Sequence, residues 1–274
     1  MPSIMRAKNF LLLLFAFSCF SCSDYSKVLK SSDPELKFTK AVEYYKDSRC
    51  YQALPLFEEL IASVRGTQRA EEAYYYFAKT HYCIEDYYLA NYYLKNFVKT
   101  FPTSQYAEEC TFLAAMCSFD LSPAHSLDQT ETRLAIDDFQ LFIDRYPYSE
   151  LKDSCNAMIG ELRGKLEKKS FEVAKLYYTT SRYRSAVVAL NNALKEHPDS
   201  PYREEMLYLI VVSNYKFAQG SVEEKKLGRF MDTIDSYYKF VANFPNSSSI
   251  IQAEVYFIRS QKEVERLKRE GYDI

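Results

Sequence analysis

The residues of this sequence that could carry covalent or metal chemistry are seven cysteines and three histidines. A cysteine thiolate is a nucleophile and a metal ligand, and an imidazole binds metals or transfers protons. The histidines are His81, His125 and His197, and none has a second histidine at ligand spacing. We therefore expect no catalytic residue, no metal site and no cofactor, and we expect that the protein is not an enzyme.

Paired carboxylates are the other groups that could perform acid–base chemistry. They occur as Glu71-Glu72, Glu108-Glu109 and Asp137-Asp138. These pairs fall in the first turns or on the exposed faces of predicted helices, where acidic side chains suit the helix dipole. The sequence also has no serine nucleophile motif and no glycine-rich phosphate loop. Solvated helix faces are therefore the simplest interpretation of these carboxylates.

Five cysteines follow the predicted leader, and none of them forms a Cys-x-x-Cys pair. They are Cys50, Cys83, Cys110, Cys117 and Cys155. An odd number of cysteines cannot all pair within one chain. We interpret these side chains as small buried hydrophobic residues.

The N-terminus predicts a different thiol chemistry, the acylation of Cys22. Arg6 and Lys8 precede an apolar run over residues 10–17, which is a signal-peptide length and too short to span a bilayer. Ser21 precedes Cys22 and polar sequence follows, which resembles the lipobox of bacterial lipoproteins. This resemblance predicts a signal peptide over residues 1–21, a lipidated tether over residues 22–34 and a folded region over residues 35–274.

Two alternatives to acylation at Cys22 remain open. Cys19 also follows a serine, and the leucine that usually stands three residues before the modified cysteine is missing at both positions. The second alternative is an ordinary signal peptide with incidental cysteines. Acyl chains contribute about 0.8 kcal/mol per buried CH₂, so multiple acylation would hold the protein stably on a membrane.

The elements that position all these residues are predicted helices, separated by a repeated tetrapeptide. Proline ends a helix, and a serine two residues later can cap the next one. This punctuation indicates a helical repeat array, with prolines 45, 51 and 47 residues apart. The four copies are Phe101-Pro102-Thr103-Ser104, Tyr146-Pro147-Tyr148-Ser149, His197-Pro198-Asp199-Ser200 and Phe244-Pro245-Asn246-Ser247.

The helix pairs match the tetratricopeptide pattern, in which a small residue marks each helix crossing. The second repeat fits best, with Ala78 in one helix and Ala90, Leu94 and Phe97 in the next. We predict an all-α fold, a tetratricopeptide-like α-solenoid of about five irregular helix pairs plus a C-terminal helix. Longer units are explained by insertions at 121–132 and 219–228, an extra helix over 149–168 and a last helix over 248–269.

Tyrosine is the compositional outlier, with 25 residues that often stand in adjacent pairs. Adjacent helical residues diverge by about 100°, so we expect one member of each pair to pack and the other to line a groove or repeat edge. The alternative is a tyrosine-rich core whose hydroxyls reach solvent. The densest patch gives five candidates for a client-binding groove, Tyr74, Tyr75, Tyr88, Tyr92 and Tyr93.

The whole predicted mature chain, residues 22–274, resembles the BamD family of lipoproteins from the outer-membrane β-barrel assembly machinery. The resemblance is strongest at residues 22–33 (CSDYSKVLKSSD), 66–72 (GTQRAEE) and 221–226 (SVEEKK). It implies an outer-membrane protein that faces the periplasm through its lipid anchor. It also implies two partners, the barrel-forming core subunit, expected at the C-terminal repeats, and unfolded outer-membrane clients, expected at the N-terminal repeats.

The predicted function is therefore a non-enzymatic adaptor in the assembly and insertion of β-barrel proteins. A formal charge of −2 offers no basic field for a phosphate backbone, so we expect no nucleic-acid partner. The alternative function is an envelope lipoprotein that binds glycan or peptidoglycan, since aromatic platforms also stack sugars. The absence of tryptophan speaks mildly against this alternative.

Overall fold

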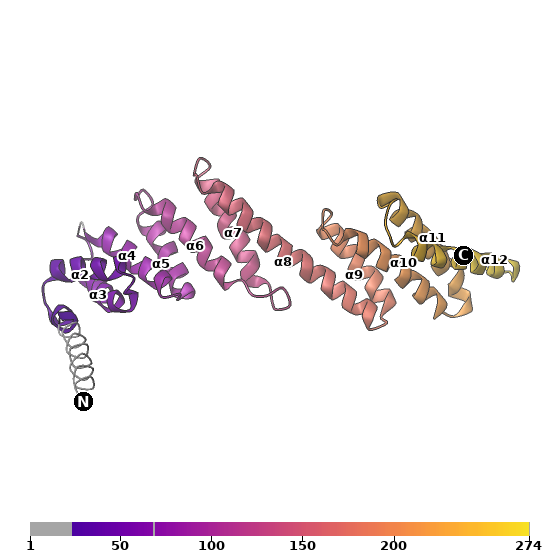
Figure 1. The fold of residues 1–274 in the computed structure, drawn as a ribbon, viewed down its shortest axis with the longest axis horizontal. Coiled ribbons are helices and arrows are strands. Elements are labelled where there is room, and N and C mark those ends of the chain that lie inside the picture. The colour runs from indigo at the N-terminus through magenta and orange to yellow at the C-terminus, as the bar shows by residue number, and fades with distance from the viewer. Residues whose placement is uncertain (1–23, 68, 274) are drawn as a thin grey trace, which may run out of the picture. The chain divides into compact units, whose positions relative to one another are not determined.

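The computed structural model describes residues 24–67 and 69–273, and these residues contain helices and no strand. The predicted signal peptide, Cys19 and Cys22 lie outside the described residues. Helices α2 to α12 follow one another along the chain (Figure 1). Their bounds are α2 (Pro34–Lys46), α3 (Cys50–Ser63), α4 (Arg69–Cys83), α5 (Tyr87–Thr100), α6 (Ala107–Leu121), α7 (Thr130–Arg145), α8 (Lys152–Thr179), α9 (Tyr183–Glu196), α10 (Arg203–Gln219), α11 (Glu223–Asn243) and α12 (Ile250–Arg269).

The helices form five consecutive pairs, from α2–α3 to α10–α11, and α12 follows the last pair. The prediction of an all-α, tetratricopeptide-like solenoid with five pairs and a C-terminal helix is confirmed. Each repeated tetrapeptide lies between two helices, as at residues 101–104, which separate α5 from α6. A proline in each of these segments explains why the preceding helix stops there.

The chain divides into two compact units. The first comprises the described residues up to Pro123 together with Gln129–Leu162, and the second comprises Ala124–Asp128 and the described residues from Arg163 onward. Helix α8 continues from the first unit into the second.

The core of the first unit is built from small residues at helix crossings and from aromatic side chains beside them. Ala78, Ala90, Leu94 and Phe97 are completely buried, which confirms the interpretation of the second repeat. Alanine lets two helix backbones approach closely, and an aromatic ring fills the remaining space. Ala41 and Ala53 play the same part in the first pair, and Ala135, Phe139 and Phe142 do so in α7.

The second unit repeats this packing. Ala174 in α8 and Ala186 in α9 are completely buried at the crossing, and Leu190 fills the space beside them. Phe171 stacks on Tyr202 with ring centroids 4.6 Å apart. Further along, Phe240 of α11 and Ala253 of α12 are buried together.

Three predicted boundaries were wrong. The extra helix expected over 149–168 and the first helix of the fourth repeat are one helix, α8, because no proline or turn sequence interrupts residues 152–179. The insertion expected at 219–228 is shorter, since α11 already begins at Glu223. Residues 24–30, expected as irregular tether, are helical, and Val28 lies in the core of the first helix pair.

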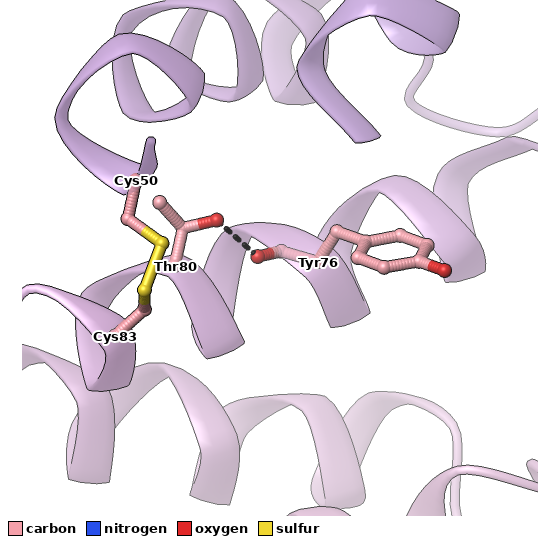
Figure 2. Close-up of a disulfide and its surroundings, with 4 residues drawn as sticks. All are labelled: Cys50, Tyr76, Thr80 and Cys83. Atoms are coloured by element: carbon pink, nitrogen blue, oxygen red, sulfur yellow. Dashed lines mark hydrogen bonds between the residues drawn. A yellow bond between two sulfur atoms is a disulfide. The ribbon is translucent and has the colours of Figure 1, made fainter. Parts of the chain in front are cut away.

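The interpretation of all five downstream cysteines as unpaired hydrophobic residues was also wrong for two of them. Cys50 and Cys83 form a disulfide with a Cα–Cα distance of 6.1 Å (Figure 2). Cys50 begins α3 and Cys83 ends α4, and antiparallel packing of these neighbouring helices brings the two ends together. The other three cysteines are free and buried, as predicted.

Candidate protein-docking surface

The five predicted groove tyrosines lie on helices α4 and α5 of the second repeat. Tyr74 and Tyr75 belong to α4, and Tyr88, Tyr92 and Tyr93 belong to α5. The structure brings them to one helix pair, but it gives them different surroundings. Three are engaged in packing, and two reach solvent.

Tyr75 belongs to the core. Its ring is 6% exposed and stacks on Tyr106 of the loop before α6 at a centroid distance of 4.0 Å. Its hydroxyl donates a hydrogen bond of 2.6 Å to Glu109 Oε2. Lys79 Nζ donates to both the Tyr75 hydroxyl, at 2.9 Å, and Glu109 Oε1, at 2.6 Å. This network joins α4 to α6.

The electrostatics of this network follow from its partial burial. Burial raises the pKa of Tyr75, and the hydrogen bond to Glu109 raises it further, so the hydroxyl stays protonated. Burial alone would raise the pKa of Glu109, but hydrogen bonds from Lys79 and Tyr75 hold that pKa below its usual value. The three groups therefore form a structural link rather than a proton-transfer site.

Tyr74 and Tyr93 are half-buried on the side that faces the first repeat. The Tyr74 ring stacks on Phe97 with centroids 6.1 Å apart. Tyr93 packs against Phe77 at 4.6 Å and against His81 at 5.0 Å. Tyr75 is therefore the buried member of this adjacent pair, whereas Tyr74 is half-buried and lines a pocket between the first and second repeats. Helix α4 contacts the helices before and after it, so it buries more than one stripe.

Tyr88 and Tyr92 form the exposed part of the predicted patch. Their side chains are 65% and 60% exposed, one helical turn apart on α5, and Leu89 beside them is 42% exposed. Two large rings and a leucine on one short helix present an apolar contact surface with polar hydroxyl tips. We call these three residues the α5 aromatic surface.

His81 has an environment that the sequence did not reveal. The imidazole is 4% exposed, lies edge-on to Phe77 at 4.8 Å, and neither ring nitrogen has a hydrogen-bond partner. Burial lowers the pKa of His81 below 6.5, while the carboxylates of Asp86 and Glu58 act in the opposite direction. The closest carboxylate oxygen, Asp86 Oδ2, is 4.0 Å from Nδ1.

The three free cysteines, Cys110, Cys117 and Cys155, are buried thiols. Burial raises the pKa of Cys110 and of Cys117 to about 12 and that of Cys155 to about 11. A thiol with such a pKa is almost entirely protonated at neutral pH, and the thiolate is the reactive form.

Among the described residues, no group of three or more histidine, cysteine, aspartate or glutamate side chains could hold a metal ion. No helix within those residues combines the length and apolar composition required to cross a bilayer.

Comparison with known proteins gives one informative result. The family model YfiO, described as outer membrane lipoprotein, matches residues 30–187 and 167–263. No curated protein sequence matches the chain. A solved structure of the assembly chaperone of RpL4 (Acl4, residues 1–338) is 12% identical and covers 87% of this chain and 99% of that chain. Its TM-score is 0.27.

Proposed function

Because the chain belongs to the YfiO family of outer membrane lipoproteins, we propose that it is a non-enzymatic adaptor in the assembly and insertion of β-barrel proteins into the outer membrane. The family match, which extends over residues 30–263, is the observation that carries this proposal. The repeat fold supports it, because stacked helix pairs offer extended surfaces for binding other proteins.

The proposed location is the periplasmic side of the outer membrane, with the chain held by acyl groups on Cys22. The Cys50–Cys83 disulfide supports this location, because structural disulfides persist in oxidising compartments such as the periplasm. The short stretch between Cys22 and α2 would keep the first helix pair close to the membrane.

The proposed partners are the barrel-forming core subunit of the assembly machinery and unfolded outer-membrane clients. Clients would contact the α5 aromatic surface, where Tyr88 and Tyr92 offer large contact area with few rotatable bonds. Tyr74, Tyr75 and Tyr93 would support this surface through the packing beneath it. The core subunit would bind the C-terminal repeats.

Co-purification tests the proposal. The tagged full-length protein is isolated from native membranes in mild detergent, and mass spectrometry identifies the proteins that accompany it. A stoichiometric outer-membrane barrel with periplasmic domains is the expected partner. The Cys22→Ala variant should lose membrane attachment. Recovery of glycan-handling proteins, together with retention of the purified chain on a peptidoglycan column, would instead support the envelope-glycan function.

A further inference from the structure

A concave groove lies between α5 and α7 in the first unit, with α6 as its floor. Its cavity has a volume of about 370 Å³. Helix α6 packs against both neighbouring helices. The groove belongs neither to the α5 aromatic surface nor to any site proposed above.

The floor of the groove is apolar. Val98 of α5 is 8% exposed and Ala114 of α6 is 3% exposed. Thr111 also lines the floor, and its hydroxyl donates a hydrogen bond to the Ala107 carbonyl at 2.7 Å. The hydroxyl proton is therefore already engaged within α6. Leu141 of α7 lies on the opposite wall with 57% of its side chain exposed. An incoming apolar side chain would therefore meet apolar surface on three sides.

The rim of the groove carries a net positive charge. Lys95 forms an ion pair with Asp138 across the groove at 2.7 Å, and Asp138 also accepts a hydrogen bond from Ser118 at 2.6 Å. Asp138 is therefore satisfied by groups of the protein itself. Lys99 and Arg145 are exposed and, among the described residues, neither has a carboxylate within ion-pair distance. Two uncompensated cations thus flank the apolar floor.

An apolar floor between exposed cations suits a ligand that carries both an apolar side chain and a negative charge. We propose that the groove binds an acidic segment of a partner protein, which places an apolar side chain against Val98, Ala114 and Leu141 and a neighbouring carboxylate between Lys99 and Arg145. Charge complementarity carries the choice, because the positive rim is local in a chain whose formal charge is −2. A membrane surface fits less well, since the apolar floor is recessed between the cations rather than exposed as a flat face.

The test measures binding of a fluorescein-labelled peptide of repeated sequence Asp-Leu-Glu-Phe to the detergent-solubilised full-length protein by fluorescence anisotropy. One control peptide replaces the acids by their amides, and another replaces the apolar residues by serine. We expect both controls to bind about 10-fold more weakly, which corresponds to about 1.4 kcal/mol. Added salt should weaken binding of the acidic peptide, because the cations are exposed.

Variants locate the binding. Lys99→Glu and Arg145→Glu should each lower the affinity about 10-fold, and Leu141→Ser should lower it as well. Lys46→Glu is the matched control, because Lys46 is also an exposed lysine in the last turn of a helix, α2. Circular dichroism melting of each variant checks that the fold is retained.

Three results would overturn the inference. The first is that the acidic peptide does not bind. The second is that Lys46→Glu lowers the affinity for the peptide as much as Lys99→Glu or Arg145→Glu does. The third is that the protein binds phosphatidylglycerol vesicles through Lys99 and Arg145 more tightly than it binds the peptide. Because the assay uses only the purified chain and a synthetic peptide, its outcome is independent of whether the chain co-purifies with a barrel-assembly complex.

Discussion

Tyr88 and Tyr92 differ from the other candidate tyrosines because their rings face solvent instead of neighbouring helices. Tyr75 is held by a stacked ring and two hydrogen-bonding partners, so it could not contact a client without disrupting the link between α4 and α6. The functional prediction for the patch therefore concentrates on the two exposed rings.

The combined substitution Tyr88→Ser and Tyr92→Ser should reduce crosslinking of unfolded outer-membrane clients at least several-fold, because it removes most of the exposed aromatic area on α5. Site-specific photo-crosslinking in cells measures this. Thermal stability should change little, since neither ring is buried. Tyr148→Ser is the control, because Tyr148 is 97% exposed in a distant loop of the same unit. Unchanged client crosslinking in the double variant would refute the role of this surface.

His81 should make stability depend on pH. Burial holds its folded-state pKa below 6.5, so the unfolded chain binds the additional proton first as the pH falls. The free energy of unfolding should therefore decrease below pH 6.5, by at most about 1.4 kcal/mol per pH unit, until the pH reaches the folded-state pKa.

Denaturant unfolding of the native protein and of His81→Phe between pH 7.5 and pH 5 measures this contribution. Phenylalanine is chosen because its ring suits the apolar surroundings of His81. The variant should lose that part of the pH dependence, whereas His125→Gln, in the loop between α6 and α7, should retain it. Identical pH dependence in the native protein and His81→Phe would show that His81 does not titrate differently in the two states.

Among the helices, α3 and α4 are the pair that is joined covalently. The Cys50–Cys83 bond closes a loop with a sequence separation of 33 residues. In the chain-entropy account, such a loop contributes about 3–4 kcal/mol by restricting the unfolded state. The disulfide thus reinforces the junction between the first and second repeats, next to the helices that carry the α5 aromatic surface.

Reduction, or the double substitution Cys50→Ser and Cys83→Ser, should lower the free energy of unfolding of the first unit by about 3–4 kcal/mol. Hydrogen exchange of α3 and α4 amides reports this loss locally. A reductant should have no further effect on the double variant, which controls for other reduction effects. Equal protection of these amides in the oxidised and reduced protein would contradict the assignment.

Two glycines inside α8 allow a test of whether the helix is continuous over residues 152–179. Gly160 and Gly164 lie within it, and a Cβ added at either position would meet no atom within 4 Å. Gly160→Ala and Gly164→Ala should each stabilise the helix by about 0.5–1 kcal/mol, because glycine is a poor helix former. Guanidinium unfolding measures the change.

The control for these substitutions is Gly66→Ala in the turn between α3 and α4. Gly66 has a φ of 81°, which L-residues rarely adopt, so alanine should destabilise there although space is available. Destabilisation by alanine at Gly160 or Gly164 would mean that α8 is not a regular helix at these positions.

The repeats could be predicted from the sequence because proline and alanine affect the helices in which they stand. Proline marks where a helix stops, and alanine marks where two helices cross closely. Pro102 and Pro147 directly follow the ends of α5 and α7, and buried alanine recurs in the first four helix pairs. The disulfide, the buried His81 and the α5–α7 groove could not be predicted in this way. Each of these features depends on which helix ends and helix faces meet in three dimensions. Cys50 and Cys83, for example, are 33 residues apart, and no local sequence pattern indicates that they pair.

Across the whole chain, fold, family and candidate surfaces are consistent with a protein that binds other proteins. The described residues form a helical repeat fold, the YfiO family match extends over most of its length, and the α5 aromatic surface and the α5–α7 groove both lie in the first unit.

The most direct test is depletion of the protein in its native bacterium, followed by measurement of folded and unfolded β-barrel proteins in the outer membrane by heat-modifiable gel mobility. The account predicts that folded barrels decline first, while other outer-membrane lipoproteins and peptidoglycan composition are still unchanged. Normal levels of folded barrels after depletion, or an earlier change in peptidoglycan, would contradict the assembly role.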